Sequence, residues 1–434
     1  MKIMKNILIT ILLLVTVSAF GQVPTPAKDQ ILPIALMNGV VHVGDGSVIE
    51  NGIITFEEGK ITSVGDARTV KVDLTNYEVI NVSGKHVYPG FITTNSSLGL
   101  NDISAVRATR DDVEVGEFTP NVRSLIAYNT DSEIIPTLRY NGILLAQVVP
   151  KGGVISGSSS IMALDGWNWE DATYAADDGI HLFWPSFLSP PKWWLGETEW
   201  KENESYKSTV QRIENFLNDA KMYSGSADPK TENLKLKAME PVLSGEKKFY
   251  VHADGKREMI EGINLLLRFE IKNIVVVGAK DAFYIMDFLK DHNVPVLLKD
   301  IHRLPGRDEE DIDLPFKLPY YLNEKGIMVG LTFGGSLQST RNLPFYAGTA
   351  AAYGLDKEEA LKMITSNTAE ILGIQESTGT LTEGKDANII VSDGDALDMR
   401  TNNILYAFIN GKKLNLEGRQ QILFERYKER YSDQ

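Results

Sequence analysis

The chain has 434 residues, of which 58 are acidic and 44 are basic, so its formal net charge at pH 7 is −14. Such acidity argues against nucleic acids and anionic membrane surfaces as partners. The absence of cysteine excludes disulfides, thiolate metal sites and a thiol nucleophile. Hydrophobic and charged fractions of 43% and 24% are ordinary for a globular protein, and the length suffices for a barrel-sized domain plus a smaller unit.

The N-terminal segment Met1–Gly21 has the pattern of a secretory signal peptide. Lys2 and Lys5 precede the apolar run Ile7–Val17, and small residues flank a cleavage position at the end of the segment. The apolar run is too short to form a stable membrane span. We therefore expect an exported protein, periplasmic or extracellular, with residues 22–30 as a flexible lead and no membrane span in the mature chain.

Two segments far apart in the sequence favour short β-strands. Residues 31–87 and 379–425 both contain alternating apolar residues separated by glycine turns, as in Gly52-Ile53-Ile54-Thr55-Phe56 and Ala387-Asn388-Ile389-Ile390-Val391. The pattern predicts one composite β-sandwich that is split in sequence by the region between the two segments.

The middle region, residues 88–378, alternates strand-like and helix-like patterns, which predicts an α/β barrel of the TIM type. The candidate strands are Gly142–Val149, Lys248–Val251, Asn273–Val277, Pro295–Leu298 and Met328–Thr332, and the candidate helices are Glu204–Asn218, Arg257–Phe269, Ala282–Asp291 and Asp356–Ser366.

Two motifs carry a family resemblance. Pro89-Gly90-Phe91-Ile92 leads into the first barrel strand, and the tail contains Ala369-Glu370-Ile371-Leu372-Gly373 followed by Gly379-Thr380-Leu381-Thr382-Glu383-Gly384-Lys385-Asp386-Ala387-Asn388. In this order the motifs resemble amidohydrolases of the imidazolonepropionase type. The resemblance implies a distorted TIM-type (β/α)8 barrel with a small β-sandwich built from both termini. It also implies a lineage of metal-dependent hydrolases that cleave C–N bonds in cyclic amides or small peptides.

The metal-ligand motif of the resembled family is degenerate. That family carries a His-x-His pair on the first strand, where this chain has Asn95 and Ser97. The family also carries a histidine where this chain has Gly278 and a general-base Asp after the last strand, where this chain has Gly334, and neither glycine can supply such a group. Among the histidines, His252 is placed at a strand end, where a ligand is expected. His252 is therefore the candidate metal ligand, and it is a candidate catalytic residue together with Asp254.

The missing ligands decide the expected function. Binding to a metal lowers the pKa of water from about 15.7 to about 7, which corresponds to about 12 kcal/mol. Neutral amide and hydroxyl oxygens hold a divalent metal weakly. We therefore expect impaired catalysis and no cofactor, with a single zinc ion as the alternative. The expected role is that of a binding or partner subunit for a small molecule, a peptide or an intact amidohydrolase paralogue.

Two alternatives remain open. The first is an active amidohydrolase with a relocated mononuclear site around His252 and Asp254, with Asp102 or His181 as further ligands. The second is a glycan- or peptide-binding protein that uses the tryptophan-rich insertion at residues 166–200, in particular Trp167 and Trp169.

The remaining candidate binding residues are Asn95, Ser97 and Ser156. Ser156 belongs to the glycine- and serine-rich stretch Lys151–Ser160, which is interpreted as a ligand-facing loop or a plain turn. A Ser-His-Asp arrangement with Ser97 or Ser156 is a further alternative, because it would need no metal.

Overall fold

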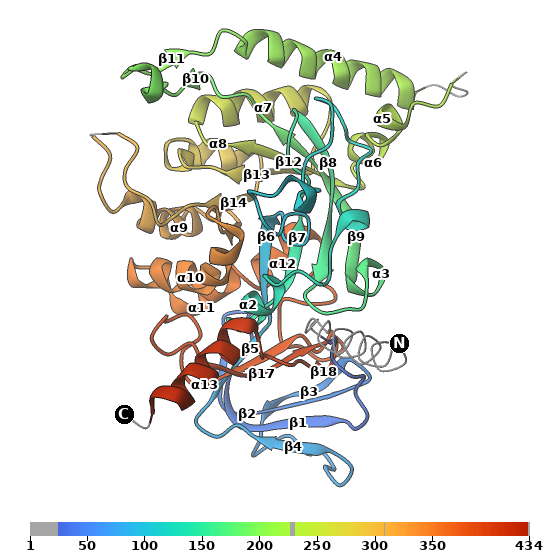
Figure 1. Cartoon of the computed structure of the whole chain (residues 1–434), viewed down its shortest axis with the longest axis vertical. Helices are drawn as coiled ribbons and strands as arrows, with labels where there is room; N and C mark the ends of the chain where they lie inside the picture. Colours follow the sequence, from blue (N-terminus) through green and yellow to red (C-terminus); the bar gives the residue numbers. More distant parts are fainter. Residues whose placement is uncertain (1–24, 226–230, 308, 433–434) are drawn as a thin grey trace, which may run out of the picture.

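The computed structural model describes residues 25–225, 231–307 and 309–432. The predicted signal peptide and the first residues of the predicted lead lie outside these ranges. Within them the chain forms a barrel and a separate sheet, which occupies the lower end of the molecule in Figure 1.

The barrel is an eight-stranded sheet in the order β15-β14-β13-β12-β9-β8-β7-β6. Its strands are β6 (Phe91–Ser96), β7 (Ile143–Val148), β8 (Ile155–Ala163), β9 (Thr173–Phe183), β12 (Lys248–Ala253), β13 (Ile274–Gly278), β14 (Val296–Lys299) and β15 (Val329–Thr332). All neighbours in this sheet pair in parallel, except that β8 runs antiparallel to both β7 and β9. The predicted distorted TIM-type barrel is therefore confirmed.

The barrel is nearly closed between its first and last strands. Ile92 N–H donates to Ile364 O, and Leu331 N–H donates to Met363 O, so the turn at these two residues fills the seam. At the same seam Thr332 Oγ1 donates to Thr94 O at 2.7 Å. These bonds bring the carboxyl ends of β6 and β15 to the same rim as those of the other parallel strands.

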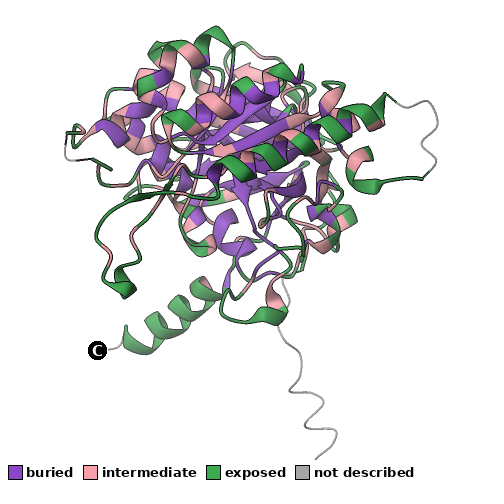
Figure 2. Cartoon of the chain, turned by 90° about the horizontal axis from the view of Figure 1, so that it is seen from above, coloured by how far each residue is buried: buried purple, intermediate pink, exposed green. Residues whose placement is uncertain are grey.

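Helices cover the outside of the barrel, with apolar faces inward and polar faces in solvent (Figure 2). They are α2 (Ile135–Arg139), α3 (Trp169–Ala172), α4 (Tyr206–Ser224), α5 (Leu234–Lys237), α6 (Glu240–Leu243), α7 (Lys256–Arg268), α8 (Met286–Asp291), α9 (Leu314–Glu324), α10 (Leu343–Ala352), α11 (Lys357–Lys362) and α12 (Ser366–Leu372). The C-terminal helix α13 (Arg419–Tyr431) is separate from this layer and exposed. A small hairpin, β10 (Leu188–Ser189) with β11 (Lys201–Glu202), lies apart from the barrel sheet.

The two terminal segments build the second sheet together. Its strands are β1 (Ile34–His42), β2 (Val48–Glu57), β3 (Lys60–Asp66), β4 (Glu78–Asn81), β5 (His86–Pro89), β16 (Ile389–Ser392), β17 (Ile404–Ile409) and β18 (Lys412–Lys413). The antiparallel pairing of β5 with β16 joins the N-terminal and C-terminal halves. The predicted composite β unit is thus a single hydrogen-bonded sheet with its own apolar core.

The predicted strands and helices occur with shifts at their ends, but several predicted segments differ. The helix expected over Ala282–Asp291 begins as a 3-10 turn, and α8 starts only at Met286. The helix expected over Asp356–Ser366 is divided into α11 and α12. The stretch Lys151–Ser160 is strand β8 from Ile155 onward rather than a loop. The end of the segment 379–425 belongs to helix α13, which has no buried residue. In the part of the chain that the structure describes, no helix is both long and apolar enough to cross a bilayer.

Candidate functional site

A pocket of about 280 Å³ lies at the mouth of the barrel. We call it the mouth pocket. Asn95, His252, Gly278 and Lys299 reach it from the carboxyl ends of β6, β12, β13 and β14, and Lys151 reaches it from the turn after β7. Sites in barrels of this type form at this rim, because the strand ends converge there.

His252 belongs to a chain of hydrogen bonds that runs from the mouth pocket into the barrel. Its Nε2 lies 2.8 Å from Nδ1 of His181, and Nε2 of His181 lies 2.8 Å from Oγ of Ser159. Oγ of Ser159 donates to Asp178 at 2.7 Å. Asp178 also accepts hydrogen bonds from the hydroxyl of Tyr250 at 2.7 Å and from the amide of Gln147 at 2.8 Å.

With Asp178 ionised, the directions of these bonds assign the tautomers of both histidines. Ser159 gives its one hydroxyl proton to Asp178, so it must accept from Nε2–H of His181. Nδ1 of His181 is then the acceptor for Nε2–H of His252. This order leaves Nδ1 of His252 with a free lone pair.

Both imidazoles are held neutral. Burial lowers the pKa of His181 well below its usual value, and nearby Lys151 lowers it further. Burial also lowers the pKa of His252 well below its usual value, with His181, Lys151 and Lys299 acting in the same direction. At the inner end of this series of hydrogen bonds, burial raises the pKa of Asp178, although its three hydrogen bonds act in the opposite direction.

Two lysines bring positive charge to the mouth pocket, which Asp254 and Glu258 also line. Nζ of Lys151 lies 3.5 Å from the backbone oxygen of Asn95, which is a weak contact. Burial lowers the pKa of Lys151, and Lys299 lowers it further by like-charge repulsion, while Asp112 opposes the shift. Lys299 has the Asp300 carboxylate at 3.7 Å.

The metal ion implied by the family resemblance does not fit these residues. Nε2 of His252 is engaged by His181, and Asn95 offers only a neutral amide, whose buried Oδ1 has no hydrogen-bond partner among the described residues. Lys151 and Lys299 would repel a divalent cation at the same place. Within the described residues, no group of three or more His, Cys, Asp or Glu side chains has the placement of a metal site.

The two glycines at expected ligand positions are tightly surrounded. Gly278 has φ +108, and a Cβ there would lie 2.6 Å from Oδ1 of Asp254. A Cβ at Gly334 would overlap the Asp300 carboxylate and the Lys299 side chain. Side chains that are already present therefore occupy the space in which a ligand side chain would begin.

The predicted site residues are only partly brought together. Asn95, His252 and Asp254 line the mouth pocket, and the carboxylate of Asp254 pairs with Lys280 at 3.1 Å. Ser97 and Ser156 are buried outside the pocket lining, and Oγ of Ser156 donates to Pro150 O.

The residues of the relocated-site alternative are also dispersed. Oδ2 of Asp102 accepts from Asn129 at 3.0 Å, and Asp102 is absent from the pocket lining. His181 is fully buried behind His252.

The tryptophans of the insertion do not form one platform. Trp184 is buried and lines the mouth pocket, where its Nε1–H donates to Tyr206. Trp167 is 70% exposed beside a different hollow, and Trp169 lies at the start of α3. Trp193 belongs to the exposed arm between β10 and β11.

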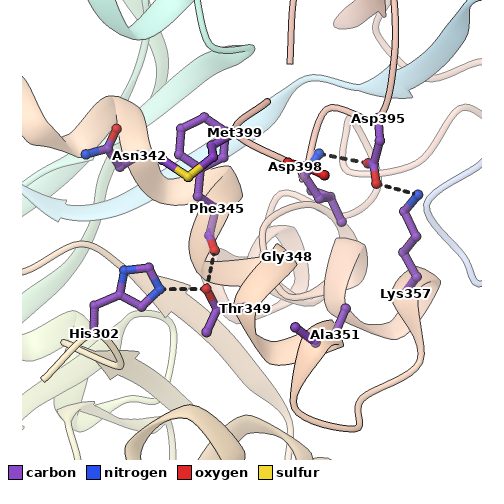
Figure 3. Close-up of a pocket in the computed structure, with 12 residues that line it drawn as sticks. His302, Asn342, Phe345, Gly348, Thr349, Ala351, Lys357, Asp395, Asp398 and Met399 are labelled. Carbon is purple, nitrogen blue, oxygen red and sulfur yellow. Dashed lines mark hydrogen bonds and ion pairs between the residues drawn. The ribbon is translucent and has the colours of Figure 1, made fainter. Parts of the chain in front are cut away.

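A second pocket, of about 450 Å³, lies outside the barrel between α10 and the turn before β17 (Figure 3). Several of its polar groups are already paired. His302 Nε2 lies 2.6 Å from Oγ1 of Thr349, and Lys357 pairs with Asp395 at 2.7 Å. Because Asn95 and Lys151 lack such partners, the mouth pocket is the stronger candidate for a functional site.

The sequence did not lead to Lys151 and Lys299, nor to the hydrogen bonds that connect His252 with Ser159 and Asp178. Lys299 directly follows an apolar run that was predicted as a strand, and Lys151 lies two residues after another, so the rule that selected His252 could also have selected them. Ser159 and Asp178 carried no such signal, because β8 and β9 were not predicted as barrel strands.

Sequence comparison supports the family resemblance over part of the chain. Residues 316–414 match the amidohydrolase family. A segment is 30% identical over 140 residues to imidazolonepropionase of Flavobacterium psychrophilum, and it covers 28% of this chain and 34% of that enzyme. The chain thus matches about a third of the curated relative's length.

Comparison with solved structures extends the likeness to nearly the whole chain. An amidohydrolase from Thermotoga maritima superposes with a TM-score of 0.77 at 22% identity, covering 88% of this chain and 99% of that one. The chain therefore has the amidohydrolase fold. A prolidase in complex with N-methylphosphonate-L-proline has a TM-score of 0.55 at 16% identity, covering 88% and 99%. The ochratoxinase of Aspergillus niger has a TM-score of 0.55 at 14% identity, covering 89% and 96%.

These likenesses establish the amidohydrolase fold and leave the chemistry of the mouth pocket open. The segment matched to the family begins at residue 316. The pocket residues Asn95, Lys151, His252 and Lys299 all precede it. The pocket must therefore be interpreted from its own residues.

Proposed function

We propose that this amidohydrolase-fold protein is impaired in metal-dependent hydrolysis and uses the mouth pocket to bind a small molecule. The observation that carries the proposal is the pair of lysines, Lys151 and Lys299, that line the pocket beside His252. A metal-binding histidine must offer a free ring nitrogen to an ion whose surroundings are neutral or negative. His252 keeps a free nitrogen, Nδ1, but the positive charges of both lysines act on this residue and would oppose a divalent cation.

The same residues fit a binding site. The rings of the pocket are held by stacking, with Phe183 on His252 at a centroid distance of 4.0 Å and Tyr250 on His181 at 4.6 Å. The series of hydrogen bonds that ends at Asp178 holds the imidazole of His252 in one tautomer. Rigid and oriented polar groups in a small pocket favour ligand binding, because little side-chain entropy is then lost on binding.

The substitution His252→Ala separates this proposal from the relocated-site alternative. If one metal at His252 drives hydrolysis, the variant loses amide-hydrolysing turnover and metal together. Under our proposal the wild-type protein has no metal-dependent turnover to lose, and the variant changes only ligand affinity. Chelator-sensitive turnover in the wild type that is abolished in the variant would contradict the proposal.

Export and a partner role belong to the same proposal and rest on the sequence alone. The pattern of the first 21 residues supports export, and an impaired relative of an enzyme could act beside an intact one. Sequencing the N-terminus of protein recovered from the cell envelope or the medium tests the first point. A mature chain that begins at Met1 would refute it. Purification of the native complex tests the second, and a protein recovered without an intact amidohydrolase paralogue would refute it.

A further inference from the structure

The charges around the mouth pocket leave one cation without a partner. Asp254 is paired with Lys280, Glu258 accepts the backbone N–H of Phe187 at 3.0 Å, and Lys299 has Asp300 nearby. Lys151 forms no ion pair among the described residues, although its side chain is largely enclosed. A partly buried ammonium group without a counter-ion is costly, and an anionic ligand would remove that cost.

The charge balance favours a monoanion over a dianion. Of the two lysines that line the pocket, only Lys151 forms no ion pair among the described residues. A second negative charge on the ligand would face the carboxylates of Asp254 and Glu258, which line the same pocket. A carboxylate suits this balance better than a phosphate dianion.

The pocket also offers two acceptors without donors. Oδ1 of Asn95 is buried and has no hydrogen-bond partner in the described part of the chain. Nδ1 of His252 retains a lone pair, because the ring donates through Nε2 to His181. A ligand that carries an N–H or O–H group beside its carboxylate could satisfy either acceptor.

We propose that the mouth pocket binds a small carboxylate that also carries a hydrogen-bond donor, such as an N-acyl amino acid. This inference rests on the proposed binding function and adds its ligand class. The carboxylate pairs with Lys151 and Lys299, and the amide N–H of the ligand donates to Asn95 or His252. A pocket volume of about 280 Å³ limits the ligand to a small molecule.

Isothermal titration calorimetry with four probes tests the proposal. N-acetylglycine has both the carboxylate and the N–H group. N-acetylglycinamide lacks the charge, and N-acetylsarcosine lacks the N–H. Inorganic phosphate exists partly as a dianion at neutral pH. We expect N-acetylglycine to bind with the highest affinity of the four. Loss of the charge should weaken binding by about 10- to 100-fold, and loss of the N–H by about 10-fold.

Substitutions assign the binding to the lysines. Lys151→Met should weaken N-acetylglycine binding by about 10- to 100-fold. Lys299→Met gives an independent second variant that should show a smaller loss. Lys385→Met is the matched control, because burial also lowers the pKa of Lys385 but that residue lies outside the pocket lining. The control should bind like the wild type, and unchanged near-UV circular dichroism shows that each variant is folded.

The outcomes distinguish this inference from the proposed function. Equal binding of N-acetylglycine and N-acetylglycinamide, or full affinity in both lysine variants, would overturn the carboxylate assignment. Equal binding of N-acetylsarcosine would overturn the donor assignment. No binding of any probe up to about 10 mM would overturn the ligand class while leaving the loss of metal chemistry untouched. Lysine-dependent binding in a protein that also holds zinc and hydrolyses amides would refute only the proposed impairment.

Discussion

Replacing Lys151 with methionine should make the protein more stable at neutral pH. Methionine keeps the apolar stem of the side chain and removes an ammonium group that is largely enclosed and has no counter-ion among the described residues. The cost of burying an ion fully is several kcal/mol. For this partly buried group beside Lys299 we expect a gain of about 1–2 kcal/mol in the free energy of unfolding.

The gain should shrink as the pH rises. The pKa of Lys151 is lowered in the folded protein, so the unfolded chain binds more protons in the range below the usual value of 10.5. The stability of the wild type, relative to the variant, therefore rises with pH between the folded-state pKa and 10.5. The difference between the two proteins is largest near pH 7 and smallest near 10.5.

Urea unfolding of wild type and Lys151→Met at several pH values between 7 and 10 measures this difference. Lys280→Met is the control, because Lys280 is 36% exposed and already paired with Asp254, so its loss should change the stability by less than about 0.5 kcal/mol. A variant that is less stable than the wild type at pH 7 would refute the reasoning. A gap that does not depend on pH would also refute it.

Two further substitutions test the interior of the barrel. Ser159→Ala removes the hydroxyl that links His181 to Asp178, so each of these buried groups loses one hydrogen bond, and the protein should be destabilised by about 1–3 kcal/mol in urea unfolding. No change would mean that these hydrogen bonds are not maintained in solution. Gly278→Ala should cost about 2–3 kcal/mol, because the new Cβ meets Asp254 at 2.6 Å and the residue keeps φ +108. Gly384→Ala is the control, because Gly384 has φ +87 but a Cβ there would have no atom within 4 Å. Only the backbone strain of about 1 kcal/mol is expected for this variant. Equal losses of stability at Gly278 and Gly384 would contradict the described packing.

Most of the fold could be predicted from the sequence, because it depends on local patterns. The apolar runs that end near His252 and Lys299 are short, buried and bounded by turn residues, and they became β12 and β14. The glycine turns at both ends of the chain predicted the terminal sheet. The helix predicted to start at Asp356 begins where expected, with its side chain accepting from Glu358 N–H and Glu359 N–H.

The arrangement of the site could be predicted only in part. His252 was found because it ends a predicted strand. Its partner His181 lies on β9, at a distance of 71 residues in the sequence, and the pairing depends on the register of β9 against β12. Ser159 lies in a run of small polar residues that is typical of loops, but burial between β7 and β9 makes it a strand. Tertiary packing decided both cases.

The metal content of the purified, full-length protein tests the central claim most directly. After growth with added zinc and removal of loosely bound ions by gel filtration, elemental analysis should find far less than one zinc ion per chain. A zinc titration should then reveal no tight site, since Lys151 and Lys299 lie beside His252 and, among the described residues, no three His, Asp or Glu side chains are placed to hold a metal together. One or more tightly held zinc ions per chain, together with amide hydrolysis that a chelator abolishes, would contradict the account.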